Sequence, residues 1–263
     1  MNRIEKKFRQ LKRNKQKAFI AFITAGYPNL KTTEKLVKAF AHSGVDLIEL
    51  GVPFSDPMAD GPIIQAASEY ALKHKVNLYD ILKLVKQLRK NNLKLPLALM
   101  SYYNPIFCFG EERFIKQAVS CGVDGVIIPD LPVEEGRSFM RLANKYHLDT
   151  ICFISPTTSF KRIKFISSVA KGFIYYVSLT GVTGIRERLA ADLIKNLKLI
   201  KRVTHKPVCV GFGVSREQQV RQIYRVADGV VVGSAIVKKI KENLSRKDLV
   251  ARVAGFVSYL KNV

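Results

Sequence analysis

Eight short apolar runs, rich in β-branched residues, alternate along this 263-residue chain with longer amphipathic stretches. The runs have the length expected of strands and are Ala18–Thr24, Asp46–Glu49, Pro96–Met100, Gly125–Ile128, Thr150–Ile154, Phe173–Val177, Pro207–Val210 and Gly229–Val232. They are nearly continuous in hydrophobicity, which is typical of a parallel sheet buried on both faces. Eight such units without a break in composition predict an α/β fold, a single (β/α)8 TIM barrel over residues 1–263.

The amphipathic stretches predict the helices that connect these strands. They are Lys31–Ser43, Leu78–Asn91, Glu112–Cys121, Glu134–Tyr146, Phe160–Ala170, Glu187–Val203 and Arg216–Val226. An extra N-terminal helix is predicted where Ile4, Phe8 and Leu11 form one narrow apolar stripe, which favours a surface helix that docks by one edge. A doubly wound open sheet is the alternative fold, and the absence of G-x-G-x-x-G after the first strand disfavours it.

The composition bears on partners and location. The formal net charge of +23 suits attraction to nucleic acid, an anionic membrane or anionic metabolites, or else lysine-rich solvated helix faces. We favour the solvated faces, and so expect no nucleic-acid partner, because the charges lie mostly on helical stretches without interleaved aromatic residues.

The apolar runs are too short for a membrane helix, and no signal-peptide hydrophobic region is expected. Four cysteines without paired spacing predict reduced core residues in a cytoplasmic protein.

Two carboxylates are the leading candidates for chemistry. Glu49 ends an apolar run, where a buried strand would emerge, and Asp60 follows on a turn-rich loop that opens into a helical stretch. Two acids in such different places can acquire different pKa values and different roles in proton transfer. The structural alternative is that Glu49 pairs with a lysine and Asp60 caps a helix. An ionisable residue at the end of a hydrophobic strand is costly unless it is paired or used, which weakens that alternative.

Glycine-rich turns follow the last three predicted strands. Gly211-Phe212-Gly213 follows the seventh, and Gly233-Ser234 follows the eighth and opens a short helix. In barrels of this kind these loops commonly bind phosphate, because glycine lets backbone N–H groups approach an anion and the helix terminus favours negative charge. Simple glycine turns are the alternative.

The loop of residues 178–184 after the sixth strand predicts a mobile lid or an inert flexible loop. Tyr175, on the sixth predicted strand, either lines the barrel mouth or packs in the core.

Several other chemistries are disfavoured. The four histidines, His42, His74, His147 and His205, fall on helices or loop ends away from the predicted strand mouths, which argues against a metal site or a histidine triad. No lysine ends a predicted strand, which disfavours a Schiff-base aldolase. Acid–base chemistry by carboxylates on a phosphorylated, largely apolar substrate remains.

Several segments together give the chain a resemblance to a known family. They are Phe22-Ile23-Thr24-Ala25-Gly26-Tyr27-Pro28, Glu49-Leu50-Gly51-Val52-Pro53-Phe54-Ser55-Asp56-Pro57, Ala59-Asp60-Gly61-Pro62-Ile63-Ile64-Gln65, Tyr102-Tyr103-Asn104-Pro105, Asp130-Leu131-Pro132, Gly181-Val182-Thr183-Gly184 and Gly211-Phe212-Gly213. From about Ala18 to Val237 the chain resembles the tryptophan synthase alpha chain, and the block from Glu49 to Gln65 is highly specific. The resemblance implies a (β/α)8 barrel that cleaves indole-3-glycerol phosphate to indole and glyceraldehyde 3-phosphate.

The resemblance also implies roles for single residues. Glu49 would be the general acid and base, and Asp60 would hold the indole N–H and stabilise positive charge on the ring. Substrate-binding residues would be Phe22, Ile64, Met100, Ile127, Tyr175, Thr183 and Phe212. Phosphate-binding residues would be Gly184, Gly213, Gly233 and Ser234.

The resemblance further implies a partner. The chain would need no cofactor or metal of its own and would pass indole to a tryptophan synthase beta chain that carries pyridoxal phosphate, in an α2β2 heterotetramer. The loop that contains Asp56 and the loop of residues 179–184 would close on the substrate and communicate with that partner. A stand-alone lyase that releases free indole, and a basic binding module on a relic barrel, are the alternatives. The intact acid pair and phosphate loops argue against the second.

Overall fold

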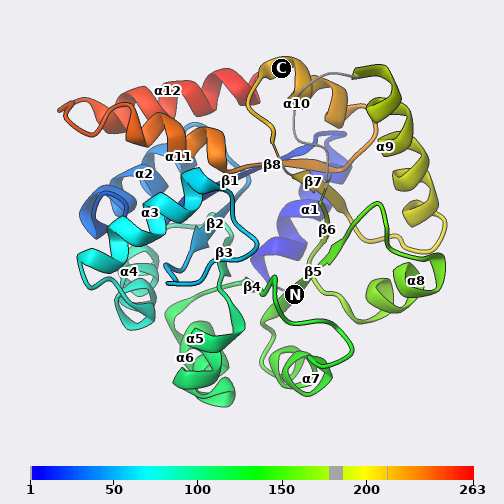
Figure 1. Cartoon of the computed structure of the whole chain (residues 1–263), viewed down its shortest axis with the longest axis horizontal. Helices are drawn as coiled ribbons and strands as arrows, with labels where there is room; N and C mark the ends of the chain where they lie inside the picture. The colour runs from blue at the N-terminus through cyan, green and yellow to red at the C-terminus, as the bar shows by residue number, and fades with distance from the viewer. Residues whose placement is uncertain (1, 178–185, 212) are drawn as a thin grey trace.

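Eight parallel strands form a closed barrel in the order β1-β2-β3-β4-β5-β6-β7-β8, with helices around the outside (Figure 1). The computed structural model describes residues 2–177, 186–211 and 213–263. The strands are β1 (Ala18–Thr24), β2 (Leu47–Gly51), β3 (Leu97–Met100), β4 (Gly125–Ile127), β5 (Asp149–Ile154), β6 (Ile174–Val177), β7 (Val208–Gly211) and β8 (Gly229–Val232). The predicted (β/α)8 TIM barrel is therefore confirmed.

The helices described by the structure begin with one that precedes β1. They are α1 (Arg3–Arg13), α2 (Leu30–His42), α3 (Pro62–Lys73), α4 (Leu78–Lys90), α5 (Tyr103–Phe109), α6 (Glu111–Cys121), α7 (Arg137–Lys145), α8 (Phe160–Val169), α9 (Arg186–Lys201), α10 (Glu217–Tyr224), α11 (Ser234–Lys241) and α12 (Leu249–Lys261). Local chemistry fixes several of their starts. Asn29 caps α2, for example, and Asn77 forms a capping box with Asp80 at α4.

Two of these helices were not anticipated from the sequence. Helix α5 has seven residues, too few to show an amphipathic period. Helix α12 packs against α2 and α11 and buries Leu249, Val253, Val257 and Leu260, yet its composition is apolar on most sides, which hides the polar face that marks a surface helix.

Helix α1 closes the N-terminal end of the barrel. Its apolar stripe is buried, with Ile4 fully covered and Phe8 8% exposed. The Phe8 ring lies 5.6 Å from the ring of Phe173, centroid to centroid, in the hydrophobic cluster that fills the barrel interior. Figure 1 shows α1 lying across the centre of the ring of strands. The stripe predicted to dock by one edge thus covers the open end of the barrel.

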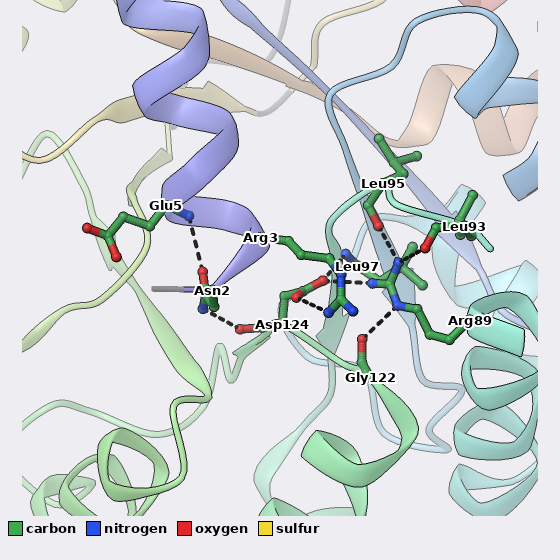
Figure 2. Close-up of polar contacts among 9 residues, drawn as sticks. All are labelled: Asn2, Arg3, Glu5, Arg89, Leu93, Leu95, Leu97, Gly122 and Asp124. Atoms are coloured by element: carbon green, nitrogen blue, oxygen red, sulfur yellow. Dashed lines mark hydrogen bonds and ion pairs between the residues drawn. The ribbon is translucent and has the colours of Figure 1, made fainter.

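A buried carboxylate fastens α1 to the barrel (Figure 2). Asp124, at the start of β4, is 2% exposed and accepts hydrogen bonds from Arg3 (2.9 Å) and Arg89 (2.7 Å). It also accepts one from the backbone N–H of Leu97, while Asn2 donates to its carbonyl. Every oxygen of this buried acid is partnered, so its ion pairs and hydrogen bonds offset the cost of taking it out of water.

The cysteine prediction is confirmed in part. The four cysteines are free, and Cys152 and Cys209 are buried in β5 and β7 as expected. Cys121 is half-buried and Cys108 is exposed, so the prediction that all four are core residues was wrong for Cys108. Cys108 lies on the short helix α5, where the sequence shows no period from which its outward position could be inferred.

None of the described helices combines the length and the hydrophobicity that crossing a membrane would require.

Candidate active site

Glu49 lies inside the barrel, not at its rim. Strand β2 continues beyond it to Gly51, so the expectation that Glu49 ends the strand was wrong by two residues. The strand continues because its neighbours continue the ladder: Glu49 is aligned with Phe22 on β1 and with Ala98 on β3. Glu49 shares its strand face with Leu47, which belongs to the interior cluster, and it is 0% exposed.

The Glu49 carboxyl has no hydrogen-bond partner on either oxygen among the described residues. The lysine partner considered as an alternative is therefore not found there. Burial raises the pKa of Glu49 from 4.5 to about 8, and no cation or donor among the described residues stabilises the ionised form. At neutral pH the group is mostly protonated and can give up a proton.

Tyr175 and Cys209 share the interior with Glu49. Burial raises the pKa of the Tyr175 hydroxyl well above its usual range, and the charges of Glu49 and Asp60 raise it further. Its hydroxyl lies against Gly211, where an added Cβ would be 2.5 Å from the oxygen. Gly211 therefore makes room for Tyr175, and glycine at this position serves packing rather than an anion. Tyr175 is 9% exposed, near both candidate acids.

Asp60 is positioned by a tyrosine that sequence reasoning left without a role. The Tyr102 hydroxyl donates to Asp60 Oδ2 at 3.1 Å and accepts from the backbone N–H of Ala59 at 2.9 Å. The Tyr102 ring also stacks on Phe54, with centroids 5.2 Å apart. Burial raises the pKa of Asp60, and the Tyr102 hydrogen bond opposes that rise. Gly61 is the N-cap of α3, so Asp60 does not cap that helix.

Four apolar candidates lie on β1, β3, β4 and α3. Phe22 on β1 is 4% exposed and lies beside Glu49 in the strand register. Met100 and Ile127 are register neighbours at the ends of β3 and β4. Ile64, on α3, is half-buried against the outer core. The structure thus brings Phe22 to Glu49 and Met100 to Ile127, while their contacts with a substrate stay a prediction.

Three of the four phosphate candidates, Gly213, Gly233 and Ser234, lie after β7 and β8. Gly233 is the N-cap of α11, and Ser234 is its first residue, so the short helix predicted after the eighth strand is confirmed. The first N–H groups of a helix have no acceptor within it and can bind an anion. A Cβ on Gly233 would lie 3.3 Å from the Phe22 side chain, which places this helix end beside the interior. Gly213 has φ +70°, a backbone conformation that favours glycine.

Three candidates, Thr183, Gly184 and Phe212, lie outside the described residues, as does the predicted lid of residues 178–184.

The four histidines lie where expected, away from the C-terminal strand ends. His42 ends α2, His74 follows α3, and His147 and His205 precede β5 and β7. Within the described ranges, no three His, Cys, Asp or Glu side chains are grouped so as to hold a metal ion.

A closed (β/α)8 barrel defines the fold class, and a buried glutamic acid without a partner among the described residues is typical of barrel enzymes that use acid–base chemistry. Residues 8–262 match the family model described as tryptophan synthase alpha chain. The tryptophan synthase alpha chain of Geotalea uraniireducens is 49% identical over 261 residues, which covers 99% of this chain and 97% of the relative.

Solved structures agree with the sequence comparison. Tryptophan synthase subunit alpha from Legionella pneumophila superposes with a TM-score of 0.92 at 40% identity and covers 99% of this chain and 97% of its own. A chain from a structural study of the tryptophan synthase α2β2 complex of Pyrococcus furiosus has a TM-score of 0.86 at 37% identity, covering 94% and 98%. The chain therefore belongs to the tryptophan synthase alpha chain family, a family of lyases that cleave indole-3-glycerol phosphate.

Proposed function

We propose that Glu49 is the general acid and base with which this chain cleaves indole-3-glycerol phosphate to indole and glyceraldehyde 3-phosphate. The observation that carries the proposal is its carboxyl, 0% exposed and without a partner among the described residues. Because the pKa of Glu49 is raised to about 8, the acid is protonated at the start of the reaction. It gives this proton to the indole ring carbon that bears the side chain and takes up the hydroxyl proton of the glycerol phosphate. The carbon–carbon bond then breaks, and the acid ends as it began.

Asp60 acts at the other side of the ring. Protonation of the ring carbon leaves positive charge on the indole, which is greatest at its nitrogen. A carboxylate that accepts the indole N–H stabilises that charge. Burial raises the pKa of Asp60, and the 3.1 Å hydrogen bond from Tyr102 opposes that rise and so favours the ionised form. The proposed division of work needs Asp60 ionised while Glu49 is protonated.

The remaining candidates bind the two ends of the substrate. Phe22, Ile64, Met100, Ile127 and Tyr175 provide the apolar surface for the indole ring, together with Thr183 and Phe212 as carried over from the family resemblance. The N-terminus of α11, with Gly233 and Ser234, takes the phosphate together with Gly213 and Gly184. An anion there gains from the free N–H groups and from the helix dipole.

We further propose that the chain works with a tryptophan synthase beta chain in an α2β2 assembly. The similarity to the Pyrococcus furiosus chain supports this assembly. Two large apolar side chains near the barrel mouth support it too: Met58, two residues before Asp60, is 83% exposed and Phe107 on α5 is 63% exposed. The beta chain would hold pyridoxal phosphate, and this chain would need no cofactor. The cytoplasmic location stays a prediction from the free cysteines.

The test is to incubate the purified chain with indole-3-glycerol phosphate, alone and with a tryptophan synthase beta chain, and to measure indole or tryptophan. We expect product in both mixtures and a strong increase with the beta chain. Fast indole release that the beta chain leaves unchanged would favour the stand-alone lyase, which no present observation favours. The absence of product in both mixtures would contradict the proposed roles of the acid pair.

A further inference from the structure

A cavity lies at the end of the barrel opposite the acid pair. It is a cleft of about 1050 Å³ between α1, the segment that joins α1 to β1, and the loops that lead into β6 and β7. Strand β5 contributes its first residue, Asp149, and α9 contributes its last, Lys201. Its volume is at the upper end of the range of small-molecule sites.

Positive charge dominates the lining of this cleft. Seven Lys and Arg side chains face three acids there, and two of those acids are already engaged, in the pairs Glu5–Arg9 and Asp228–Lys201. Five cations then remain, against Asp149 alone: Lys12, Lys15, Lys17, Lys171 and Lys206. Of these, Lys12, Lys15 and Lys17 form no ion pair with any described residue. Cations gathered in a concave site without matching carboxylates attract an anion from solution.

Two of the cations in the cleft, Lys171 and Lys206, lie close enough to repel each other. Lys206 is half-buried and donates to the backbone carbonyl of Ser167, a neutral acceptor. Burial lowers the pKa of Lys206, and the neighbouring Lys171 ammonium lowers it further. An anion bound between the two ammonium groups would relieve this repulsion and raise the pKa of Lys206 toward its ordinary value.

We propose that this basic cleft, lined by Lys12, Lys15, Lys17, Lys171 and Lys206, binds a small molecule that carries two or more phosphate groups. The cleft also has an apolar side, formed by Phe8, Leu11, Val203 and Pro207, which suits an organic body attached to the phosphates. Single-stranded nucleic acid is the competing ligand of the same chemistry. It is disfavoured because such binders present exposed aromatic rings for base stacking, whereas Phe8 is 8% exposed.

The experiment compares two triple variants of equal charge. The cleft variant carries Lys12→Gln, Lys15→Gln and Lys17→Gln, and the control variant carries Lys83→Gln, Lys86→Gln and Lys90→Gln on α4. The control lysines are exposed, as are Lys12 and Lys15 (Lys17 is half-buried), and they lie outside the cleft. Both variants keep the substrate's proposed phosphate site, so tripolyphosphate that enters that site contributes equally to both. Binding of inorganic tripolyphosphate and of a single-stranded oligonucleotide is measured by titration calorimetry, and indole release and melting temperature are measured alongside.

We expect the cleft variant to bind tripolyphosphate at least about tenfold more weakly than the control variant, because three convergent cations are lost. Indole release and melting temperature should match between the two. Equal affinity for tripolyphosphate in the two variants would overturn the proposal. Tighter binding of the oligonucleotide than of tripolyphosphate, lost in the cleft variant alone, would also overturn it and assign the cleft to nucleic acid.

Discussion

Two buried acids at opposite ends of the barrel have opposite surroundings. Asp124, at the N-terminal end, is 2% exposed and receives Arg3, Arg89 and the N–H of Leu97. Glu49, in the interior toward the C-terminal end, is 0% exposed and has no partner on either oxygen among the described residues. A partnered carboxylate stabilises the fold, whereas an orphaned one costs stability and persists where its reactivity is used. The difference separates a structural end of the molecule from a chemical one.

The largest effect should come from removing the proton that Glu49 carries. We expect Glu49→Gln to lower indole release by roughly 10²–10⁴-fold, toward the upper end because one group serves both proton transfers. The amide is neutral and nearly isosteric with the protonated acid, so the melting temperature should change little. Initial rates with indole-3-glycerol phosphate and a thermal melt test both halves of the prediction. Full activity in this variant would end the proposed role.

The same variant isolates the effect of Glu49 on stability as pH changes. The pKa of Glu49 is raised to about 8 in the folded chain, against an ordinary value of 4.5. Between these values the unfolded chain releases the proton and the folded chain keeps it, so rising pH favours unfolding. The free energy of unfolding should fall, relative to Glu49→Gln, by up to about 1.4 kcal/mol per pH unit, or about 4–5 kcal/mol in all. The difference should be constant below about 4.5 and above about 8. Urea unfolding across this range measures it, and parallel curves would show that the Glu49 pKa is not raised.

Asp124 should behave in the opposite way. We expect Asp124→Asn to lower the free energy of unfolding by about 3–5 kcal/mol, because Arg89 is left buried without its counter-charge. The rate per folded molecule should be unchanged, since Asp124 lies at the far end of the barrel. Urea unfolding and active-site-normalised rates test this prediction. Glu134→Gln, which removes the exposed pair with Arg162, is the control and should change stability little. A stable but inactive Asp124→Asn variant would contradict the division between the two ends.

The contrast between the two acids also shows what the sequence could and could not predict. The barrel followed from eight short apolar runs that alternate with amphipathic stretches, since short runs rich in β-branched residues favour strands and a helical period in the longer stretches favours helices. Glu49 and Asp60 stood out because a carboxylate beside a hydrophobic strand is unusual. The sequence could not show that Glu49 lies within β2, because strand ends depend on the neighbouring ladder. It also could not show Tyr102 bonded to Asp60, 42 residues away, or the basic cleft, which needs α1 and distant loops together.

Asp60 should show a smaller effect than Glu49, because it stabilises charge without transferring a proton to carbon. We expect Asp60→Asn to lower indole release by roughly 10²-fold or more, which is the rate loss typical when one electrostatic stabiliser of the transition state is removed. The amide still fits beside Tyr102, so the fold should be kept. The rate with indole-3-glycerol phosphate tests this, with the melting temperature as the control on folding. A change of only a few-fold would remove Asp60 from the mechanism.

Tyr102 should show the smallest effect, and it tests whether Asp60 needs positioning. Tyr102→Phe removes the hydroxyl that donates to Asp60 and accepts from Ala59, while the ring can still stack on Phe54. One such hydrogen bond contributes ~1 kcal/mol, so indole release should fall by roughly five- to tenfold. Without its donor the Asp60 pKa should rise further, so the acid limb of the rate profile should move to higher pH. A purely structural hydroxyl would lower stability without moving that limb. In the Asp60→Asn background the change should have little further effect on the rate, because two residues that act through one contact are not additive.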